Sequence, residues 1–441
     1  MTIKKLKDSI LLKVIFNGFM VIGLLIPLFM VSDIVSEREK RRGEAEREVS
    51  GKWGFSQRVT GPILTIPYKI YYKDKKNILR MKIKNAYFLP RSLKIDGKIT
   101  PEKRSRGLYE VMLYKLENLK ISGAFNYPDF KKLRISNKNV LWDEAFITMG
   151  IPDTRGIQKE VVLRWNGRKI SFSPGVKGSS IYSSGIHANI KKLEKRSLLK
   201  FKFHLNLQGS SSLSFIPIGK ETIVDIESTW KHPSFFGSYL PTKRKITSRG
   251  FRANWKISYF GRNFPQEWTD STKPSMSSMY NSSFGVKIYM PVDFYQKCVR
   301  AVKYGFLFIS LTFLCFFLFE ILNKLNIHPL QYLLIGSAMC LFYLLFLSLS
   351  EHMNFILSYI LSSLGVIGMI AGYSYKILKS KSSVVSMTVF LVFLYGYLFI
   401  LLQNQDYALV LGSLALFAIL GLVMYLTRNI DWYNLKFKAE G

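Results

Sequence analysis

Lysine and arginine are absent from two long stretches of the chain, Leu325 to Tyr375 and Ser382 to Thr427. Full positive charges are costly inside a lipid bilayer, so long stretches without them are typical of membrane-spanning helices. The basic residues crowd into the region from Asp33 to Lys303, which holds 52 of the 63 Lys and Arg and 23 of the 29 Asp and Glu. This middle region therefore carries a net charge of +29.

Cysteine is also scarce. The three cysteines, Cys298, Cys315 and Cys340, avoid the body of the middle region and do not have the spacing of metal ligands. A disulfide framework is thereby excluded. The middle region must instead be held by a hydrophobic core, which its size permits.

Motifs of the common chemistries are missing too. The chain has no G-x-x-x-x-G-K-[ST] nucleotide loop, no G-x-S-x-G elbow and no H-E-x-x-H pair. These absences argue against an ATP-driven transporter working from this chain alone, and we predict neither a catalytic residue nor a cofactor. The five histidines are scattered and predict no metal site: His187, His204, His232, His328 and His352.

Six apolar segments are each long enough to cross a bilayer. The first, Val14 to Val31, follows four lysines and lacks a small-x-small cleavage site, which favours an uncleaved anchor over a signal peptide. The connections among the later segments are short, so neighbouring helices must run antiparallel. These segments are Tyr304 to Leu322, Pro329 to Ser350, Asn354 to Tyr375, Val384 to Leu402 and Tyr407 to Leu426.

The basic residues of the short segments predict the orientation. With a cytoplasmic N-terminus, six spans return the C-terminus to the cytoplasm. The cytoplasmic segments then hold all the Lys and Arg that lie outside the middle region. The two short outer loops, near Glu351-His352 and from Gln403 to Asp406, hold none. We therefore predict two cytoplasmic termini and an extracytoplasmic middle region.

The middle region has the pattern of a β-rich domain. Phe201 to Leu207 alternates apolar and polar residues, and Met81 to Lys84 does so as well, which is typical of strands with one solvated face. The predicted fold is thus an α-helical bundle of six transmembrane helices, with a large β-rich extracytoplasmic domain inserted between helices 1 and 2. The predicted parts are 1–32 (N-terminus and anchor), 33–303 (β-rich domain), 304–426 (five-helix bundle) and 427–441 (cytoplasmic tail).

One aromatic segment of the β-rich domain is a candidate recognition loop, because function often lies on loops. A structural turn packed by its own rings is the alternative. The candidate residues are Trp230, His232, Pro233, Phe235 and Phe236.

Polar residues at the ends of the membrane helices form two further candidates. Near the cytoplasmic boundary, Glu320 should be neutralised by a basic neighbour, with Arg428 the first choice and His328 or Lys324 next. Asp431 should lie at the same depth, and Trp432 and Tyr433 at headgroup level. At the outer end stands the pair Glu351 and His352. Because these residues lie at helix ends, anchoring roles are favoured over conduction.

A small-residue face is also predicted within the fourth span. Gly365, Gly368, Ala371 and Gly372 recur on one side of that helix. Helix packing explains such a face without any substrate.

The chain resembles the cell envelope integrity protein CreD family along its whole length. The resemblance implies a bacterial inner-membrane protein linked to envelope integrity and made under a Cre-type two-component system, and it implies no known reaction. It is carried by Gly61-Pro62 with Ile66-Pro67, Tyr87 to Pro90, Asp153 to Gly156, Trp230 to Gly237, His328 to Leu334, Ser350 to His352 and Arg428 to Tyr433.

The charge of the middle region indicates the kind of partner. A net +29 outside the cytoplasm attracts polyanions and anionic headgroups, whereas the compartment disfavours nucleic acid. The expected partners are the lipid bilayer and either an anionic envelope polymer or another envelope protein. We expect a non-enzymatic envelope protein. Two alternatives remain open: a transporter or channel component, and a membrane-embedded enzyme acting on lipid or cell-wall precursors.

Overall fold

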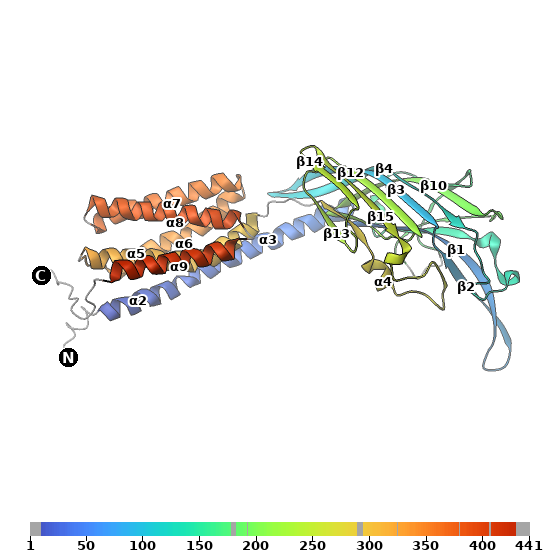
Figure 1. The fold of residues 1–441 in the computed structure, drawn as a ribbon, viewed down its shortest axis with the longest axis horizontal. Coiled ribbons are helices and arrows are strands. Elements are labelled where there is room, and N and C mark those ends of the chain that lie inside the picture. The colour runs from blue at the N-terminus through green and yellow to red at the C-terminus, as the bar shows by residue number, and fades with distance from the viewer. Residues whose placement is uncertain are drawn as a thin grey trace. The chain divides into compact units, whose positions relative to one another are not determined.

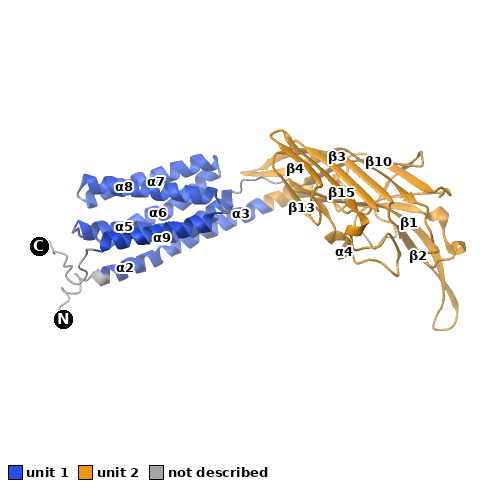
Figure 2. Cartoon of the chain, viewed as in Figure 1, with its two compact units in different colours: residues 1–43, 292–441 blue, residues 44–291 orange. Residues whose placement is uncertain are grey.

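The chain folds into two compact units, which Figure 2 distinguishes by colour: residues 1–43 with 292–441, and residues 44–291. The computed structural model describes residues 10–177, 182–191, 193–288, 294–323, 325–378, 380–404 and 407–428. The first unit is helical and the second is rich in strands, so the β-rich domain stands between the first and second membrane helices, as predicted. Its boundaries, after residues 43 and 291, fall inside the predicted limits of 33 and 303.

Six helices of the described residues are long and apolar enough to cross a membrane, which confirms the predicted spans. Helix α5 begins at Phe294, ahead of the predicted Tyr304, because the intervening residues are helical but too polar to count as an apolar span. The spans are α2 (Ile10–Gly23) continued by α3 (Leu25–Trp53), α5 (Phe294–Leu322), α6 (Pro329–Ser350), α7 (Phe355–Ile377), α8 (Lys381–Gln403) and α9 (Ala408–Thr427).

The first membrane helix is interrupted at Leu24, between α2 and α3. Pro27 explains the interruption, because it has no N–H to donate to the carbonyl of Gly23 and its ring crowds that carbonyl. The carbonyl oxygen of Leu24 accepts a weak hydrogen bond from Cys340 of α6, with Sγ and oxygen 3.8 Å apart. The break therefore provides a contact between the first helix and α6.

Two glycines let the first helix approach its neighbours closely. A Cβ atom at Gly336 of α6 would lie 2.1 Å from Cδ1 of Leu24, and one at Gly305 of α5 would lie 2.9 Å from Cδ2 of Leu28. Small residues of this kind are the usual means of close helix packing in membranes.

The small-residue face predicted on α7 does not pack in this way. A Cβ atom at Gly365, Gly368 or Gly372 would meet nothing within 4 Å in the described part of the chain. The predicted packing role of that face is therefore wrong within this chain. Spacing alone did not reveal which side of α7 is covered.

The β-rich domain consists of a nine-stranded and an eight-stranded sheet (Figure 1). The nine-stranded sheet has the order β13-β17-β11-β1-β5-β9-β8, with β2 and β16 attached beside β1, and the eight-stranded sheet has the order β14-β15-β12-β3-β4-β10-β6-β7. Strand pairs are antiparallel except β1 with β11 and β3 with β12. The strands are β1 (Gln57–Lys73), β2 (Leu79–Phe88), β3 (Ser92–Arg106), β4 (Tyr109–Asn126), β5 (Phe146–Gly150), β6 (Val162–Trp165), β7 (Arg168–Ser171), β8 (Ser173–Pro174), β9 (Gly185–Asn189), β10 (Leu198–Ser210), β11 (Ser212–Phe215), β12 (Glu221–Ser228), β13 (Pro233–Gly237), β14 (Lys243–Thr247), β15 (Gly250–Ser258), β16 (Glu267–Thr269) and β17 (Phe284–Ile288). Short helices connect some of them: α4 (Met276–Asn281) and the 3-10 turns η1 (Asn137–Asn139), η2 (Trp142–Glu144), η3 (Thr154–Gly156) and η4 (Tyr259–Gly261).

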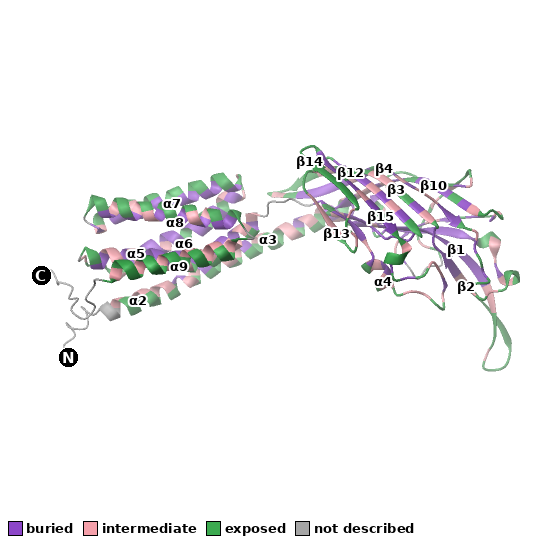
Figure 3. Cartoon of the chain, viewed as in Figure 1, coloured by how far each residue is buried: buried purple, intermediate pink, exposed green. Residues whose placement is uncertain are grey.

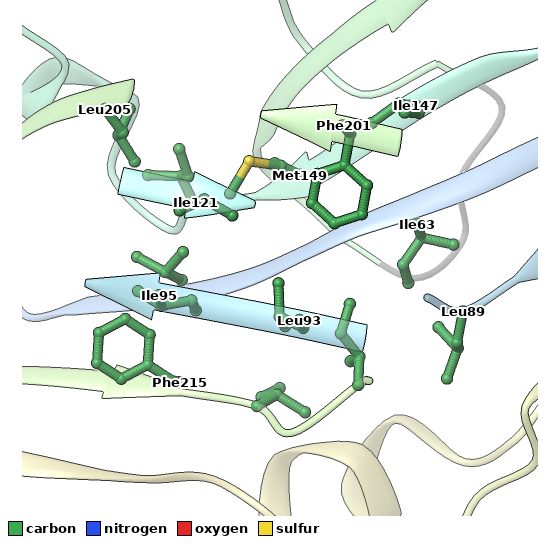
Figure 4. Packing of buried hydrophobic residues seen from close by; sticks show 14 of the residues in the cluster. Ile63, Leu89, Leu93, Ile95, Ile121, Ile147, Met149, Phe201, Leu205 and Phe215 are labelled. Carbon is green, nitrogen blue, oxygen red and sulfur yellow. The ribbon is translucent and has the colours of Figure 1, made fainter. Parts of the chain in front are cut away.

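The two sheets share one hydrophobic core. Ile63 of β1, Met149 of β5 and Phe215 of β11 meet side chains such as Ile95 of β3 and Phe201 of β10 (Figure 4). The alternation predicted for β10 is confirmed, because its apolar side chains are buried and its polar ones point to solvent. Burial of apolar surface, with no cysteine available in the body of the domain, is what holds the sheets together.

Candidate functional site

Glu320 is buried at one end of the helical unit, with 1% of its surface exposed. Its carboxylate accepts from Nζ of Lys13 at 2.6 Å, from the hydroxyl of Tyr332 at 2.9 Å and from the backbone N–H of Ile327 at 3.1 Å. Lys13 also donates to Asn326, at 2.7 Å. Buried charges need such partners, and these come from α2, from α6 and from the segment between α5 and α6. The cluster therefore joins three membrane helices.

The basic partner of Glu320 is thus Lys13, and the prediction of Arg428 was wrong. The guanidinium of Arg428 lies instead over the ring of Tyr425, with 4.2 Å between Cζ and the ring centre. The candidates Arg428, His328 and Lys324 were basic residues next to the later spans, at the same predicted boundary of the membrane as Glu320. The lysine that precedes the first span, one residue before Val14, was the signal that this reasoning missed.

His328 begins α6 as its N-terminal cap. Its ring accepts a hydrogen bond from the N–H of Leu330 at 3.2 Å, and the side chain of Gln331 accepts from the N–H of His328 at 2.9 Å. This reciprocal arrangement satisfies backbone donors that a helix start leaves free. The predicted neighbours Lys324, Asp431, Trp432 and Tyr433 lie outside the described residues.

Glu351 follows the last residue of α6, at the other end of that helix. It accepts from the hydroxyl of Tyr295 at 3.1 Å, and Nε of Arg38 lies 3.7 Å from the same carboxylate. His352 is exposed, and its backbone N–H bonds to Leu349. Among the described residues no hydrogen bond or ion pair joins its ring to Glu351. The partners of Glu351 are therefore Arg38 and Tyr295, and His352 stands apart.

The two ends of the helical unit are built alike. Each has a carboxylate, a basic residue of the first helix and a tyrosine: Glu320 with Lys13 and Tyr332, and Glu351 with Arg38 and Tyr295. The carboxylates flank α6, whose 22 residues span roughly 33 Å. They are too far apart to act on one substrate. These contacts attach the first helix to its neighbours at two places, Lys13 near its start and Arg38 in the middle of α3.

Hydroxyl groups within the spans mostly serve their own helices. Thr312 donates to the carbonyl of Phe308, and Ser362 donates to that of Ser358, one turn earlier in each case. Hydroxyls that bond one turn back need no partner across the bundle. The Ser and Thr hydroxyls of this kind are therefore occupied within their own helices, whereas the hydroxyl of buried Tyr359 on α7 donates across to the carbonyl of Tyr395 on α8.

The predicted recognition loop is largely a strand. Pro233 to Gly237 forms β13, which pairs with β17 at the end of the nine-stranded sheet. Phe235 packs edge-on against Phe251 and Trp255, whereas Phe236 lies near Nζ of Lys287, 5.3 Å from its ring centre. The expectation of a loop was wrong because the aromatic residues follow the inward and outward alternation of a strand. A recognition role for this segment stays a prediction.

Trp230 and His232 precede that strand in a tight turn. The indole N–H of Trp230 donates to the carbonyl of His232 at 3.0 Å, and the two rings are nearly perpendicular. His232 is exposed. This turn is held by its own rings, as the structural alternative expected.

The segment Asp153 to Gly156 forms a clasp on the end of α3. Both carboxylate oxygens of Asp153 accept from Arg155, from Nε and from a terminal nitrogen, each at 2.9 Å, and the N–H of Phe55 also donates to Asp153 at 3.1 Å. Arg155 donates in turn to the carbonyl of Gly51 in the last turn of α3, at 2.7 Å. The hydrogen bonds from Arg155 hold the pKa of Asp153 below its usual value.

One face of the eight-stranded sheet gathers positive charge. Lys202 of β10 stands opposite Arg164 of β6, and His204 stands opposite Lys120 of β4, so these side chains share the solvent side with Lys200. Among the described residues, no acidic side chain forms an ion pair with Lys120, Arg164, Lys200 or Lys202. These four residues with His204 are called the basic face below.

The basic face borders a shallow depression of about 650 Å³. Small residues of β4, Ser122, Gly123 and Ala124, form part of its lining beside Arg164, Lys200 and Lys202. Partial burial and the positive charges of Lys202, Lys120 and Arg164 lower the pKa of His204. The total charge of the domain follows from the sequence, but only the register between the strands shows that these five residues lie side by side.

Among the described residues, no group of three His, Cys, Asp or Glu side chains comes together as a metal site. The histidines of the basic face and of the β13 turn, His204 and His232, have lysines and aromatic rings for neighbours. These neighbours are not metal ligands, so neither histidine belongs to such a group.

Comparison with known proteins agrees with this architecture. The family described as "Inner membrane protein CreD" matches residues 9–433. The inner membrane protein CreD of Escherichia coli (strain K12) is 33% identical over 419 residues, which cover 94% of this chain and 91% of that protein. A crystal structure of an M1 zinc metallopeptidase from Deinococcus radiodurans aligns with 38% of each chain at 8% identity and a TM-score of 0.16, which supports no inference. With its six spans and a match over nearly its full length, the chain belongs to the CreD family of multi-pass inner membrane proteins.

Proposed function

We propose that this inner-membrane protein contributes to envelope integrity as a non-enzymatic binding protein. In this proposal both termini are cytoplasmic, the β-rich domain lies outside the cytoplasm, and that domain engages an anionic envelope polymer. The observation that carries the proposal is the basic face on β4, β6 and β10, whose lysines and arginine have no acidic partner among the described residues.

The chemistry of the basic face suits phosphate or carboxylate groups. Arg164 offers a planar fork for two-point contact with such groups, and Lys200 and Lys202 add mobile point charges beside it. Positive side chains that lack internal partners gain more from an external anion than paired ones do, because no existing contact is lost. The small residues of the depression allow a chain of anionic groups to lie close to the sheet.

The arrangement of the helices supports an anchoring role over the two alternatives. A transporter or a membrane-embedded enzyme needs polar groups that converge on one cavity. Glu320 and Glu351 are separated by the length of α6, and each is occupied by a base and a tyrosine. Neither alternative has a specific observation in its favour among the described residues.

The binding step is tested with full-length purified protein and soluble polyphosphate as the probe. Arg164→Gln combined with Lys202→Gln should weaken binding about thirtyfold, since each surface charge contributes roughly 1 kcal/mol and 1.4 kcal/mol is a factor of ten. Arg252→Gln combined with Lys256→Gln is the matched control, because both residues lie on β15 of the same sheet but are paired, with Asp225 at 2.9 Å and with Glu221 at 3.3 Å. An equal loss in the control shows that only total charge matters, and then the basic face is not a site.

The envelope role needs a test in cells. A strain that carries Arg164→Gln with Lys202→Gln, at the wild-type protein level, should be as sensitive to detergents as a strain that lacks the protein. A strain that carries Arg252→Gln with Lys256→Gln should resist detergents as the wild type does. A photo-crosslinker at Ser122 in intact envelopes should capture an anionic polymer. If the deletion strain has no envelope defect, the integrity role fails even where polyphosphate binding is measured.

A further inference from the structure

The hairpin of β1 and β2 continues beyond the sheet to which both strands belong. The pairing of β2 with β16 ends at Ala86, and that of β1 with β5 ends at Thr65, yet β1 and β2 stay paired as far as Lys73 with Leu79. Residues 69–84 are called the free ribbon below. From Lys69 to Lys73 the ribbon extends for about 15 Å. Figure 1 shows it protruding from the strands of the domain.

The free ribbon is largely exposed, as its colouring shows (Figure 3), and the register places exposed large apolar side chains on both of its faces. Tyr71 stands opposite Met81 in the register, so they share one face with Leu79 and Ile83. Their exposed fractions are 53% for Tyr71, 52% for Met81, 66% for Leu79 and 50% for Ile83. The strand over Met81 to Lys84 was expected to bury its apolar side, and that expectation was wrong because the ribbon has left the sheet. Clustered exposed apolar residues mark an interaction surface.

Positive charge surrounds these apolar side chains. Residues 69–84 contain seven Lys and Arg and one acidic residue, Asp74. The carboxylate of Asp74 is already used, because it accepts from the N–H groups of Lys76 and Ile78 and from Nε of Arg80 at 3.0 Å. Among the described residues no ion pair involves Lys73, Lys75 or Lys76. The lysines at the tip therefore flank the apolar face without acidic partners.

We propose that the free ribbon docks on a lipid surface rich in anionic headgroups. Tyr71, Leu79 and Met81 enter the boundary between headgroups and acyl chains, while the lysines at the tip contact lipid phosphates. A hydrated polyanion offers nothing to the apolar side chains, and an apolar protein groove offers nothing to the lysines. A bilayer surface with anionic headgroups satisfies both. This site is independent of the basic face, which lies on the other sheet.

The test uses full-length protein in nanodiscs of phosphatidylcholine, mixed with separate vesicles of phosphatidylcholine alone or with phosphatidylglycerol. The wild type should float with the phosphatidylglycerol vesicles. Leu79→Ser combined with Met81→Ser should weaken this binding roughly thirtyfold, since each buried apolar side chain contributes on the order of 1 kcal/mol and 1.4 kcal/mol is a factor of ten. Leu240→Ser is the matched control, because Leu240 is 68% exposed elsewhere in the same domain. It should bind like the wild type.

A second measurement separates lipid insertion from simple anion binding. An environment-sensitive dye on Leu79→Cys should brighten with phosphatidylglycerol vesicles and stay unchanged with inorganic phosphate or polyphosphate. The unsubstituted protein, treated with the same dye, corrects for its own cysteines. Wild-type binding by the double serine variant overturns the proposal. A dye that responds equally to polyphosphate, or not at all to vesicles, overturns it as well. Neither result bears on the basic face, which its own variants test.

Discussion

Lys13 and Glu320 form an ion pair, with 2.6 Å between Nζ and Oε1, although they come from the first and second membrane helices of the chain. Glu320 is 1% exposed, and 20% of the Lys13 side chain is exposed. Lys13→Met leaves the buried carboxylate of Glu320 without its cation, and Glu320→Gln leaves the ammonium group of Lys13 without its anion. Each substitution should lower the free energy of unfolding by about 3 kcal/mol. The double variant should cost less than the sum by roughly 1–3 kcal/mol.

The free energies of unfolding of the wild type, the two single variants and the double variant are measured in detergent, with proteolysis as the probe of unfolding. Arg428→Gln is the control, because its guanidinium lies over Tyr425. Its effect should simply add to that of Glu320→Gln. Strict additivity between Lys13 and Glu320 would contradict the ion pair.

The contact of Gly336 with Leu24 predicts that a valine at this position lowers stability more than a valine at an uncovered glycine of another helix. Gly336→Val should destabilise the helical unit by about 2 kcal/mol, because a side chain there meets Leu24 and Phe313. Gly365→Val, on α7, should change stability by less than about 0.5 kcal/mol, since nothing lies within 4 Å of its Cβ position in the described chain. Thermal unfolding of both variants in detergent decides the matter, and equal effects would contradict the packing described.

The clasp formed by Asp153 predicts a loss of stability in acid. Arg155 lowers the pKa of Asp153 in the folded protein, so the stabilisation is present above the unfolded pKa and is lost as the pH falls through the folded pKa. Asp153→Asn should cost roughly 1–3 kcal/mol at neutral pH and should flatten the decline in acid. The melting temperature as a function of pH measures this. Asp225→Asn is the control, because the side chain of Asp225 is 22% exposed whereas that of Asp153 is 7% exposed, although both are paired with an exposed arginine.

The basic face predicts that anion binding takes up a proton at His204. Partial burial and Lys202, Lys120 and Arg164 lower the pKa of His204 in the free protein. A bound polyanion offsets these cations and raises that pKa, so affinity for polyphosphate should increase as the pH falls through the region below the ordinary histidine value of about 6.5. His204→Asn should remove this pH dependence and leave binding at pH 8 nearly unchanged. Nuclear magnetic resonance titration of the ring, with and without polyphosphate, reports the shift directly.

The proposed orientation predicts two reporter results. Fusions placed after Lys324 and after Arg428 should both read as cytoplasmic, because the basic residues of the short segments lie on that side. Fusions in the loop near Glu351 should read as extracytoplasmic and serve as the control. A periplasmic signal from either of the first two positions would contradict the orientation.

The sequence was sufficient for the spans and for the β-rich character of the domain, because hydropathy and two-residue alternation act locally. It was not sufficient for Lys13 with Glu320, or for Arg38 with Glu351, since those pairs depend on how distant helices pack. The strand at Phe235 and the free ribbon at Met81 show a further limit. Alternation identifies a strand, but whether each side of it is covered depends on partners elsewhere in the chain.

The basic face illustrates the same limit for the site. Composition gave a total charge, and the lysines of β10 were visible as alternate residues. Arg164 and Lys120 come beside them only through the pairing of β10 with β6 and with β4, which are distant from β10 in the sequence. Long-range pairing of this kind has no local signal.

The position of β17 in the nine-stranded sheet affects how the domain forms during synthesis. This strand is the last of the domain in the sequence, yet it lies between β13 and β11, and β11 pairs with the first strand, β1. The sheet therefore cannot close until the ribosome has made nearly everything up to α5. Non-local pairing of this kind folds slowly, so in the proposed orientation the unfinished strands must wait while the chain is still crossing the membrane. A pause in translation at the point where α5 has been made but is still inside the ribosome would give the domain time to close before the remaining helices arrive.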